Sequence, residues 1–395
     1  MLRGKTVVLG VTGSIAAYKI ANLTSMLVKL HCDVHVLMTK NATNFIHPIT
    51  FETLTNHKCL VDTFDRNFNY NIEHVSLAKK ADFVLVAPAS ANIIGKMANG
   101  IADDMLSTTL LACKCPIAVA PAMNTVMFEN RIVQDNMRRL REYGITIIEP
   151  DCGMLACRDV GAGKLPKEEV LLAYILKEIA CKKDFQGKKV LITAGPTREA
   201  LDPVRFITNH STGKMGYALA KAAMLRGADV TLVSGPTSVA KPDFVHIVDV
   251  ESAEDMYQAV MSEMDSQDIF ILSAAVADYR PGTVSEQKIK KSEASMTIAC
   301  EKTKDILKTL GEKKKEGQIL CGFAMETENL LENAVAKLKK KNADMICANS
   351  LRMEGAGFGV DSNVLTLVTR AETQQLEKMS KEACAHKILD KIISL

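Results

Sequence analysis

Apolar residues occur along this chain in short continuous runs, not in alternation with polar ones. In the first half such runs lie at Thr6–Val11, Val34–Met38, Phe83–Ala87, Ile117–Ala120 and Ile145–Ile148. Strands that are apolar throughout are typical of parallel sheets covered on both faces. The first run leads directly into a stretch that predicts a helix reaching about Leu30. We therefore expect a doubly wound α/β sheet, whose ligand binds at the carboxyl ends of the strands.

The same pattern begins again at mid-chain. Further runs lie at Val190–Thr193, Val230–Ser234, Val245–Val248, Ile269–Ser273, Ile319–Gly322, Met345–Ala348 and Val364–Val368. Their spacing predicts a second, Rossmann-like sheet. A basic, polar segment at 182–189 separates the two series and is expected to be a linker. The prediction is therefore two α/β domains, at 1–181 and 190–395.

Composition and charge narrow the class of protein. The 395 residues are 47% hydrophobic and 24% charged, as in soluble globular proteins. A net charge of +3 is too small to indicate nucleic acid or an anionic membrane. The apolar runs are too short for a membrane span of ~20 residues, and the N-terminus enters a strand at once, so no signal peptide is expected. The 11 scattered cysteines favour reduced thiols in a cytoplasm.

Small and hydroxyl residues follow the strands of the first half. Thr12-Gly13-Ser14-Ile15 comes after the first strand, Thr39 after the second, Pro88-Ala89-Ser90-Ala91-Asn92 after the third and Pro121-Ala122-Met123-Asn124 after the fourth. The dinucleotide fingerprint GxGxxG is absent. Hydroxyl residues around one helix N-terminus fit a single phosphate, as in a mononucleotide such as FMN. Small residues also simply pack helices onto sheets, so the spacing leaves both interpretations open.

Two loops of the second half also suit a phosphate. Ala194-Gly195-Pro196-Thr197 ends a strand, and Asn209–Gly216 precedes a helix predicted at Tyr217–Arg226. Free N–H groups and the helix dipole favour an anion there, although an ordinary strand–loop–helix crossover is the alternative. The run Ser273–Pro281 ends another strand with small residues and Asp278, which suits a nucleotide and its metal. Lysines at 288, 290, 291, 337 and 341 are usually solvated surface, but beside such loops they could neutralise phosphates.

The longer motifs resemble two known families. GSIAAYK at 13–19, NIEHVSL at 71–77, PASANIIGKMANGIADD at 88–104 and PAMNTVMFEN at 121–130 resemble the flavin-dependent cysteine decarboxylases. The second half resembles the phosphopantothenate–cysteine ligases through ITAGPTREALDPVRFITNHSTGKMG at 192–216, SAAVADYRP at 273–281 and KIKK at 288–291. The resemblance covers nearly the whole chain. It implies a bifunctional enzyme of coenzyme A biosynthesis, with a flavodoxin- or Rossmann-like flavoprotein domain and a Rossmann-like ligase domain.

For the first half the resemblance implies an FMN-dependent phosphopantothenoylcysteine decarboxylase. The implied FMN-binding residues are Gly13, Ser14, Ile15, Thr39, Ser90, Ala91, Asn92 and Ser107. His74 would be the catalytic histidine. Without the resemblance, a single histidine in this stretch would be taken as structural or exposed. Asn124 would hold the substrate carboxylate. The segment Asp151–Gly163 would be a substrate lid whose Cys157 donates a proton. Without the resemblance, this segment would be taken as a surface loop. Arg158 and Phe128 depart from the family pattern.

For the second half the resemblance implies a CTP-dependent ligase with Mg²⁺. The implied CTP-binding residues are Leu272, Ser273, Ala274, Asp278, Lys288, Lys304, Asp305, Ile306, Leu307, Phe323, Lys337 and Lys341. Asp278 would also hold the metal, and Asn209 and Lys288 would form and resolve an acyl-cytidylate. The enzyme would join 4′-phosphopantothenate to cysteine, and then decarboxylate the product oxidatively to 4′-phosphopantetheine.

The implied partners are small molecules and further copies of the chain, with no nucleic acid and no membrane. Trimers of decarboxylase domains and dimers of ligase domains would together build a dodecamer. Two other classes of protein stay open. A decarboxylase acting on a peptide C-terminal cysteine is disfavoured by the ligase motifs. A non-catalytic flavoprotein subunit that inhibits phosphatases is disfavoured by the presence of His74 and Asn124.

Overall fold

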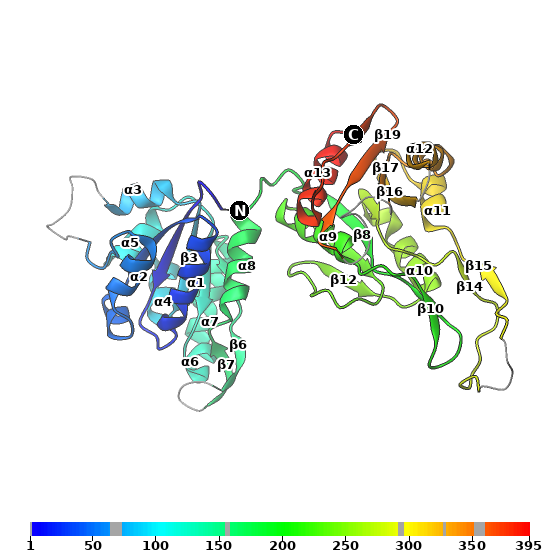
Figure 1. Cartoon of the computed structure of the whole chain (residues 1–395). Coiled ribbons are helices and arrows are strands. Elements are labelled where there is room, and N and C mark those ends of the chain that lie inside the picture. Colours follow the sequence, from blue (N-terminus) through cyan, green and yellow to red (C-terminus); the bar gives the residue numbers. More distant parts are fainter. Residues whose placement is uncertain (1, 64–72, 155–158, 291–295, 327–328, 351–359) are drawn as a thin grey trace. The chain divides into compact units, whose positions relative to one another are not determined.

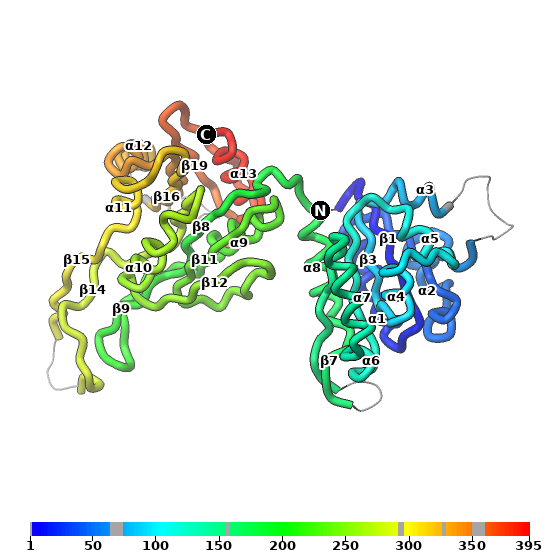
Figure 2. The backbone as a smooth tube through the Cα atoms, turned by 180° about the vertical axis from the view of Figure 1, so that it is seen from behind, coloured from blue at the N-terminus to red at the C-terminus, as the bar shows by residue number. Residues whose placement is uncertain are grey.

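The computed structural model of the chain forms two compact units, Met1–Cys181 and Lys182–Leu395 (Figure 1). The structure describes residues 2–63, 73–154, 159–290, 296–326, 329–350 and 360–395. Both units combine helices with a mainly parallel sheet, and Figure 2 shows the backbone of both units from behind. This confirms the predicted α/β class. Within the described ranges, no helix has the length and apolar character that crossing a membrane requires.

The first unit is organised around a five-stranded parallel sheet in the order β2-β1-β3-β4-β5. The strands are β1 (Thr6–Val11), β2 (Asp33–Met38), β3 (Phe83–Ala89), β4 (Ile117–Pro121) and β5 (Thr146–Ile147). Every residue of β1 and β3 is buried, which explains why these strands are apolar throughout. The order is that of flavodoxin, in which the ligand binds where β1 and β3 diverge.

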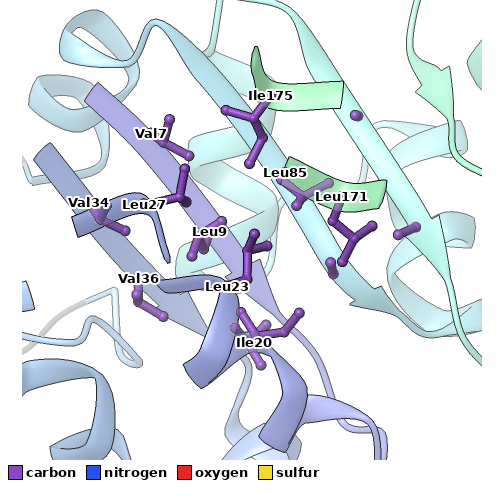
Figure 3. Close-up of a cluster of buried hydrophobic side chains, with 14 of the residues drawn as sticks. Val7, Leu9, Ile20, Leu23, Leu27, Val34, Val36, Leu85, Leu171 and Ile175 are labelled. Carbon is purple, nitrogen blue, oxygen red and sulfur yellow. The ribbon is translucent and has the colours of Figure 1, made fainter. Parts of the chain in front are cut away.

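Helices cover both faces of this sheet. On one face, Leu23 and Leu27 of α1 and Leu171 of α8 pack with the strand residue Leu9 in a single apolar cluster (Figure 3). A second cluster joins the other face to α4, α5 and α7. The helices are α1 (Ala17–Lys29), η1 (Lys40–Asn44), α2 (Pro48–Thr55), α3 (Glu73–Lys80), α4 (Ala91–Asn99), α5 (Met105–Ala112), α6 (Thr125–Glu129), α7 (Arg131–Glu142) and α8 (Glu168–Ile179).

A hairpin of β6 (Asp151–Met154) and β7 (Val160–Lys164) was not predicted. The sequence indicated a glycine-rich loop, but the described parts of that segment pair antiparallel. The N–H of Met123 donates to the carbonyl of Gly163 at 3.0 Å. Gly163 has a φ of +128°, and a Cβ there would lie 2.3 Å from the Met123 carbonyl oxygen. Only glycine therefore lets the hairpin pack this closely on the β4–α6 loop.

The second unit contains an eight-stranded sheet in the order β12-β11-β8-β13-β16-β17-β19-β20. These strands are β8 (Lys189–Ala194), β11 (Asp229–Ser234), β12 (His246–Asp249), β13 (Ile269–Leu272), β16 (Ile319–Glu326), β17 (Met345–Ser350), β19 (Leu365–Thr369) and β20 (Thr373–Gln375). The parallel part has the Rossmann order, so the predicted Rossmann-like sheet is confirmed. The antiparallel edge formed by β19 and β20 was not predicted.

Helices and three two-stranded antiparallel sheets complete this unit. The helices are α9 (Lys214–Leu225), α10 (Ala253–Glu263), η2 (Met264–Ser266), α11 (Ile306–Lys313), α12 (Leu330–Lys340) and α13 (Lys381–Ile393). These small sheets pair β9 (Arg198–Ala200) with β10 (Phe206–Thr208), β14 (Tyr279–Pro281) with β15 (Cys300–Lys302), and β18 (Ser362–Asn363) with β21 (Met379–Ser380). Helix α9 begins at Lys214, earlier than the predicted Tyr217, so the lysine of the glycine-rich loop lies in its first turn.

Part of the segment predicted as a linker packs against the second unit. Phe185 is 1% exposed, and the guanidinium of Arg226 lies 4.8 Å from the centre of its ring. The same guanidinium donates hydrogen bonds of 2.8 and 2.7 Å to the two carboxylate oxygens of Asp184. Asp184 and Phe185 are thus structural residues of the second unit.

Candidate functional site

The first unit has a cavity of about 440 Å³ at the carboxyl ends of β1, β3 and β4. Of the residues predicted for this half, six line it: Gly13, Ser14, Ile15, Ser90, Ala91 and Asn124. The hairpin closes one side with Met154 and Gly163. The cavity therefore lies where β1 and β3 diverge, the position at which a flavodoxin-like sheet binds its ligand.

Thr12 joins the two loops that form this cavity. Its side chain is 1% exposed. The hydroxyl donates to the carbonyl of Pro88 at 2.7 Å and accepts from the N–H of Ser90 at 3.0 Å. The β1–α1 loop is thereby fixed against the β3–α4 loop. Thr12 belongs to the predicted motif after the first strand but was given no role there, although a hydroxyl at the end of a buried strand must find a partner.

Two helix N-termini border the cavity. Ala16 precedes α1 and Ser90 precedes α4, both residues line the cavity, and neither side chain caps its helix. Uncapped first-turn N–H groups and the positive end of the helix dipole favour a negatively charged group. This end of the sheet therefore suits a phosphate.

The other residues predicted to bind FMN do not line the cavity. Thr39, at the end of β2, has a buried hydroxyl without a hydrogen-bond partner among the described residues. Asn92 lies in the first turn of α4. The hydroxyl of Ser107 donates to Asp104 at 2.9 Å and accepts from its N–H at 3.1 Å, which completes the N-terminal cap of α5. The unpartnered Thr39 hydroxyl and the uncapped helices fit a phosphorylated, hydroxyl-rich ligand such as FMN.

The residues predicted to catalyse decarboxylation are only partly brought together. The Asn124 amide donates to the Asp159 carboxylate at 2.9 Å, and its oxygen accepts from the N–H of Val126 at 2.9 Å. The Asn124 amide therefore binds a carboxylate beside the cavity. His74 lies in α3 and, among the described residues, is not part of the cavity lining. Cys157 lies outside the described residues.

The second unit has a cavity of about 150 Å³ at the carboxyl ends of β13, β16 and β17 and the start of α9. It is lined by Ser273, Ala274 and Phe323 of the predicted nucleotide-binding set. The end of β13 and the start of α9, which both border this cavity, lie beside the point where a Rossmann order reverses. Gly213 precedes α9 in a left-handed conformation with a φ of +78° and provides no side-chain cap. The start of α9 is thus another uncapped helix N-terminus beside a cavity.

Hydrogen bonds place Asn209 and the segment around Lys288. The Asn209 amide donates to the carbonyl of Ala275 at 2.9 Å, next to Ala274. Asp202, 3% exposed in the β9–β10 loop, accepts from the N–H of Ile289 at 3.1 Å. Lys288 is exposed and, among the described residues, does not line this cavity.

Among the remaining residues of the predicted nucleotide site, the charged ones have polar partners and the others are apolar side chains of the unit. Lys337 donates to the carbonyl of Phe323 at 2.8 Å, which connects α12 to the cavity wall. Lys341 is ion-paired with Asp305. Burial alone would raise the pKa of Asp305, but the hydrogen bonds from Lys341 and from the N–H of Lys308 hold it below its ordinary value. Lys304 instead pairs with Glu254 at 2.7 Å, while Leu272, Ile306 and Leu307 are half-buried or buried apolar side chains of the unit.

Asp278 does not belong to a preformed metal cluster among the described residues. The one cluster found there, Asp33, His35 and His57, lies in the first unit, and its carboxylate pairs with Lys80 at 2.6 Å. Asp278 itself is exposed. Mg²⁺ is commonly bound by one or two carboxylates together with substrate phosphates. A lone Asp278 therefore fits a metal that arrives with the nucleotide.

Comparison with known proteins identifies the family. The Flavoprotein family matches residues 1–180, and the DNA/pantothenate metabolism flavoprotein C-terminal domain matches residues 185–395. The chain is 48% identical to the coenzyme A biosynthesis bifunctional protein CoaBC of Bacillus subtilis (strain 168), over 100% of this chain and 98% of that one. This chain belongs to the coenzyme A biosynthesis bifunctional protein family. CoaBC of Escherichia coli (strain K12) is 41% identical over the same shares of the two chains.

Among solved structures, the chain is similar to the C-terminal domain of a CoaBC protein. The identity is 46%, with 54% of this chain and 97% of that chain covered, and the TM-score is 0.47. The CoaBC membership of the chain confirms the resemblance found from its motifs. It also confirms the prediction of a bifunctional enzyme whose first half is a flavoprotein.

Proposed function

We propose that the chain catalyses two successive steps of coenzyme A biosynthesis. The first is CTP-dependent ligation of 4′-phosphopantothenate with cysteine, and the second is FMN-dependent decarboxylation of the product to 4′-phosphopantetheine. We assign decarboxylation to residues 1–181 and ligation to residues 190–395. The observation that carries this proposal is that each unit has a cavity at its own topological switch point, lined by residues of the matching motif.

In the decarboxylase unit, the uncapped start of α1 with Gly13, Ser14 and Ile15 would bind the FMN phosphate. Ser90, Ala91 and the Thr39 hydroxyl would complete the FMN site. When bound, FMN would accept two electrons from the cysteine moiety so that carbon dioxide can leave, and would return them to the decarboxylated product.

Substrate would be oriented by the side chains around this flavin. Asn124 would hold the substrate carboxylate, and its bond to Asp159 shows that its amide can bind one. His74 would act as an acid or base, a role that an imidazole side chain can fill. Cys157 would donate the proton that completes the product.

In the ligase unit, the start of α9 would bind a phosphate group and Asn209 would act beside Ala274. Activation by CTP is required because an ionised carboxylate is a poor acyl donor. The carboxylate of 4′-phosphopantothenate would attack the α-phosphate, release pyrophosphate and form an acyl-cytidylate. The cysteine amine would then displace CMP. Lys288 would neutralise charge on the phosphates, and Asp278 would bind Mg²⁺, which would supply further positive charge to them.

Two assays on the full chain test the assignment of both activities. Pyrophosphate release requires CTP, 4′-phosphopantothenate and cysteine, while carbon dioxide release requires only phosphopantothenoylcysteine and FMN. We expect Lys288→Gln to reduce pyrophosphate release about 10²–10³-fold and to leave carbon dioxide release unchanged. Lys290→Gln, also exposed, is the matched control and should behave like the wild type. Near wild-type pyrophosphate release by Lys288→Gln would refute its role.

We also propose that the chain acts in the cytoplasm as a homo-oligomer, with trimers of the first unit and dimers of the second combining into a dodecamer. Native mass spectrometry of the purified chain measures this directly. A monomer or a simple dimer at working concentration would contradict the proposed assembly without affecting either assigned reaction.

A further inference from the structure

A cluster of nitrogen and oxygen donors lies on the edge strand of the first unit, and neither proposed reaction uses it. Asp33 and His35 are two positions apart in β2, so their side chains leave the strand on the same face. His57 follows α2 and comes from a different segment of the chain. All three side chains are half-buried. The cluster lies in the amino-terminal half of β2, whereas the cavity of this unit lies at the carboxyl ends of β1, β3 and β4.

The two imidazole rings are arranged around one carboxylate. They are stacked, with ring centres 4.2 Å apart and planes inclined by 14°. The Nε2 atom of His57 lies 2.7 Å from Asp33 Oδ1, and that of His35 lies 3.3 Å from Asp33 Oδ2. The three residues offer ligand atoms that all lie within 4.8 Å of one another. Zinc bonds of about 2.0–2.2 Å place tetrahedral ligand atoms roughly 3.3–3.6 Å apart, so small side-chain rotations would bring all three onto one ion.

The ammonium group of Lys80 shows that this cluster already attracts a cation. Its Nζ atom lies 2.6 Å from Asp33 Oδ2 and 3.4 Å from His35 Nε2. Lys80 is in the last turn of α3 and its side chain is 52% exposed, so it can move aside into water. An ammonium group only donates hydrogen bonds, whereas a metal ion accepts the lone pairs of both rings and of the carboxylate. A metal ion would therefore use these donors more fully than Lys80 does.

The types of donor indicate which ion the cluster suits. Imidazole nitrogen suits Zn²⁺, copper and nickel, whereas Mg²⁺ prefers oxygen ligands. We propose that Asp33, His35 and His57 form a binding site for a divalent transition-metal ion such as Zn²⁺, and that Lys80 leaves Asp33 when the ion binds. Three protein ligands leave the fourth tetrahedral position to water. The ion joins the segment after α2 to the edge strand and releases the last turn of α3 from it.

The test measures equilibrium binding of Zn²⁺ and of Mg²⁺ to the full chain by titration calorimetry at neutral pH. His57→Gln removes one ligand of the site, and His246→Gln, which changes an exposed histidine of the second unit, is its matched control. Lys80→Met removes the competing ammonium group, and Lys79→Met, which changes the exposed neighbouring lysine, is the control for it. The 11 cysteines can also bind Zn²⁺, so the differences between variants assign the site. Thermal unfolding without metal shows whether each variant is folded.

We expect His57→Gln to weaken one Zn²⁺-binding event by more than the roughly 10- to 100-fold that losing a residue behind a metal ligand costs. Lys80→Met should tighten the same event about 2- to 5-fold, the range for an exposed ion pair. Zn²⁺ should raise the unfolding temperature of the wild type and of Lys80→Met more than that of His57→Gln, because an ion that binds the folded protein stabilises it. Mg²⁺ should not distinguish the variants, and both controls should behave like the wild type.

The opposite results each overturn the proposal. Identical Zn²⁺ titrations of the wild type and His57→Gln would mean that any bound zinc lies elsewhere, for example on thiols. Weaker binding by Lys80→Met would mean that Lys80 supports the ion instead of competing with it. Binding by Lys80→Met alone would mean that the ammonium group keeps the site closed in this chain. The gain expected of Lys80→Met cannot arise from misfolding, so it tests the site even if His57→Gln proves unstable.

Discussion

Thr12→Val tests whether one buried hydroxyl maintains the cavity of the first unit. Valine has nearly the shape of threonine, so the change removes two hydrogen bonds and leaves the packing of β1 intact. The carbonyl of Pro88 and the N–H of Ser90 then lose a partner at 2.7 and 3.0 Å. The Thr12 side chain is 1% exposed, and water cannot easily replace it.

The expected loss follows from these two contacts. A neutral intramolecular hydrogen bond contributes about 0.5–1.5 kcal/mol, and a buried group left unsatisfied costs about 1–3 kcal/mol. We therefore expect the free energy of unfolding of the first unit to fall by roughly 2–4 kcal/mol. For a domain of this size that is a decrease of roughly 4–16 °C in its unfolding temperature. FMN should also bind more weakly, because the two loops that would hold it are no longer joined.

Hydrogen exchange followed by mass spectrometry gives the local measurement. Peptides from the β3–α4 loop of Thr12→Val should exchange faster than those of the wild type, while peptides of the second unit stay unchanged. Thr12→Ser retains the hydroxyl and serves as the control, with exchange in this loop close to wild type. If the valine variant exchanges and unfolds like the wild type, the two hydrogen bonds do not stabilise the cavity and the reasoning is wrong.

Three further changes address other parts of the chain. Arg226→Met should lower the free energy of unfolding of the second unit by about 1.5–3 kcal/mol in urea melts at neutral pH. The Arg226 hydrogen bonds lower the pKa of Asp184, so this loss should be full above the ordinary pKa of an aspartate and shrink as the pH falls below it. Gly163→Ala should impair carbon dioxide release, because its Cβ would meet backbone at 2.3 Å, and pyrophosphate release reports whether the ligase unit is intact. Cys157→Ser should stall decarboxylation before the final protonation, detected as an enethiol product, whereas Cys152→Ser should be nearly normal; the reverse result would move the proton donor to Cys152.

The strands could be predicted because the physics that forms them is local in sequence. A run such as Thr6–Val11 is apolar at every position because helices cover both faces of the sheet, and this pattern is visible without a structure. The order of the strands is not visible in the same way. The strand at Leu365–Thr369 is as apolar as its parallel neighbours, yet it pairs antiparallel with β17. Burial therefore determined the apolar pattern of each strand. The direction of each strand depended on the connections between strands, which a single apolar run does not reveal.

The β6–β7 hairpin shows a different limit. Its residues are mostly exposed and include glycines, so the sequence has the pattern of a loop. What holds β7 in place is a backbone contact between Gly163 and Met123, which lie 40 positions apart by their numbers. A contact between backbone atoms leaves almost no trace in side-chain pattern, apart from the glycine it requires.

Both cavities share an asymmetry that explains which site residues the sequence revealed. The walls formed by strand ends, such as Gly13–Ile15 or Ser273–Ala274, lie within continuous motifs and were found. The opposite walls come from the C-terminal part of each unit, the β6–β7 hairpin in one and β17 with the first residue of α13 in the other. Asn349 and Lys381 occur there singly, among residues of ordinary pattern. They become conspicuous only when the fold is known, because their burial and their place in the cavity lining are then apparent.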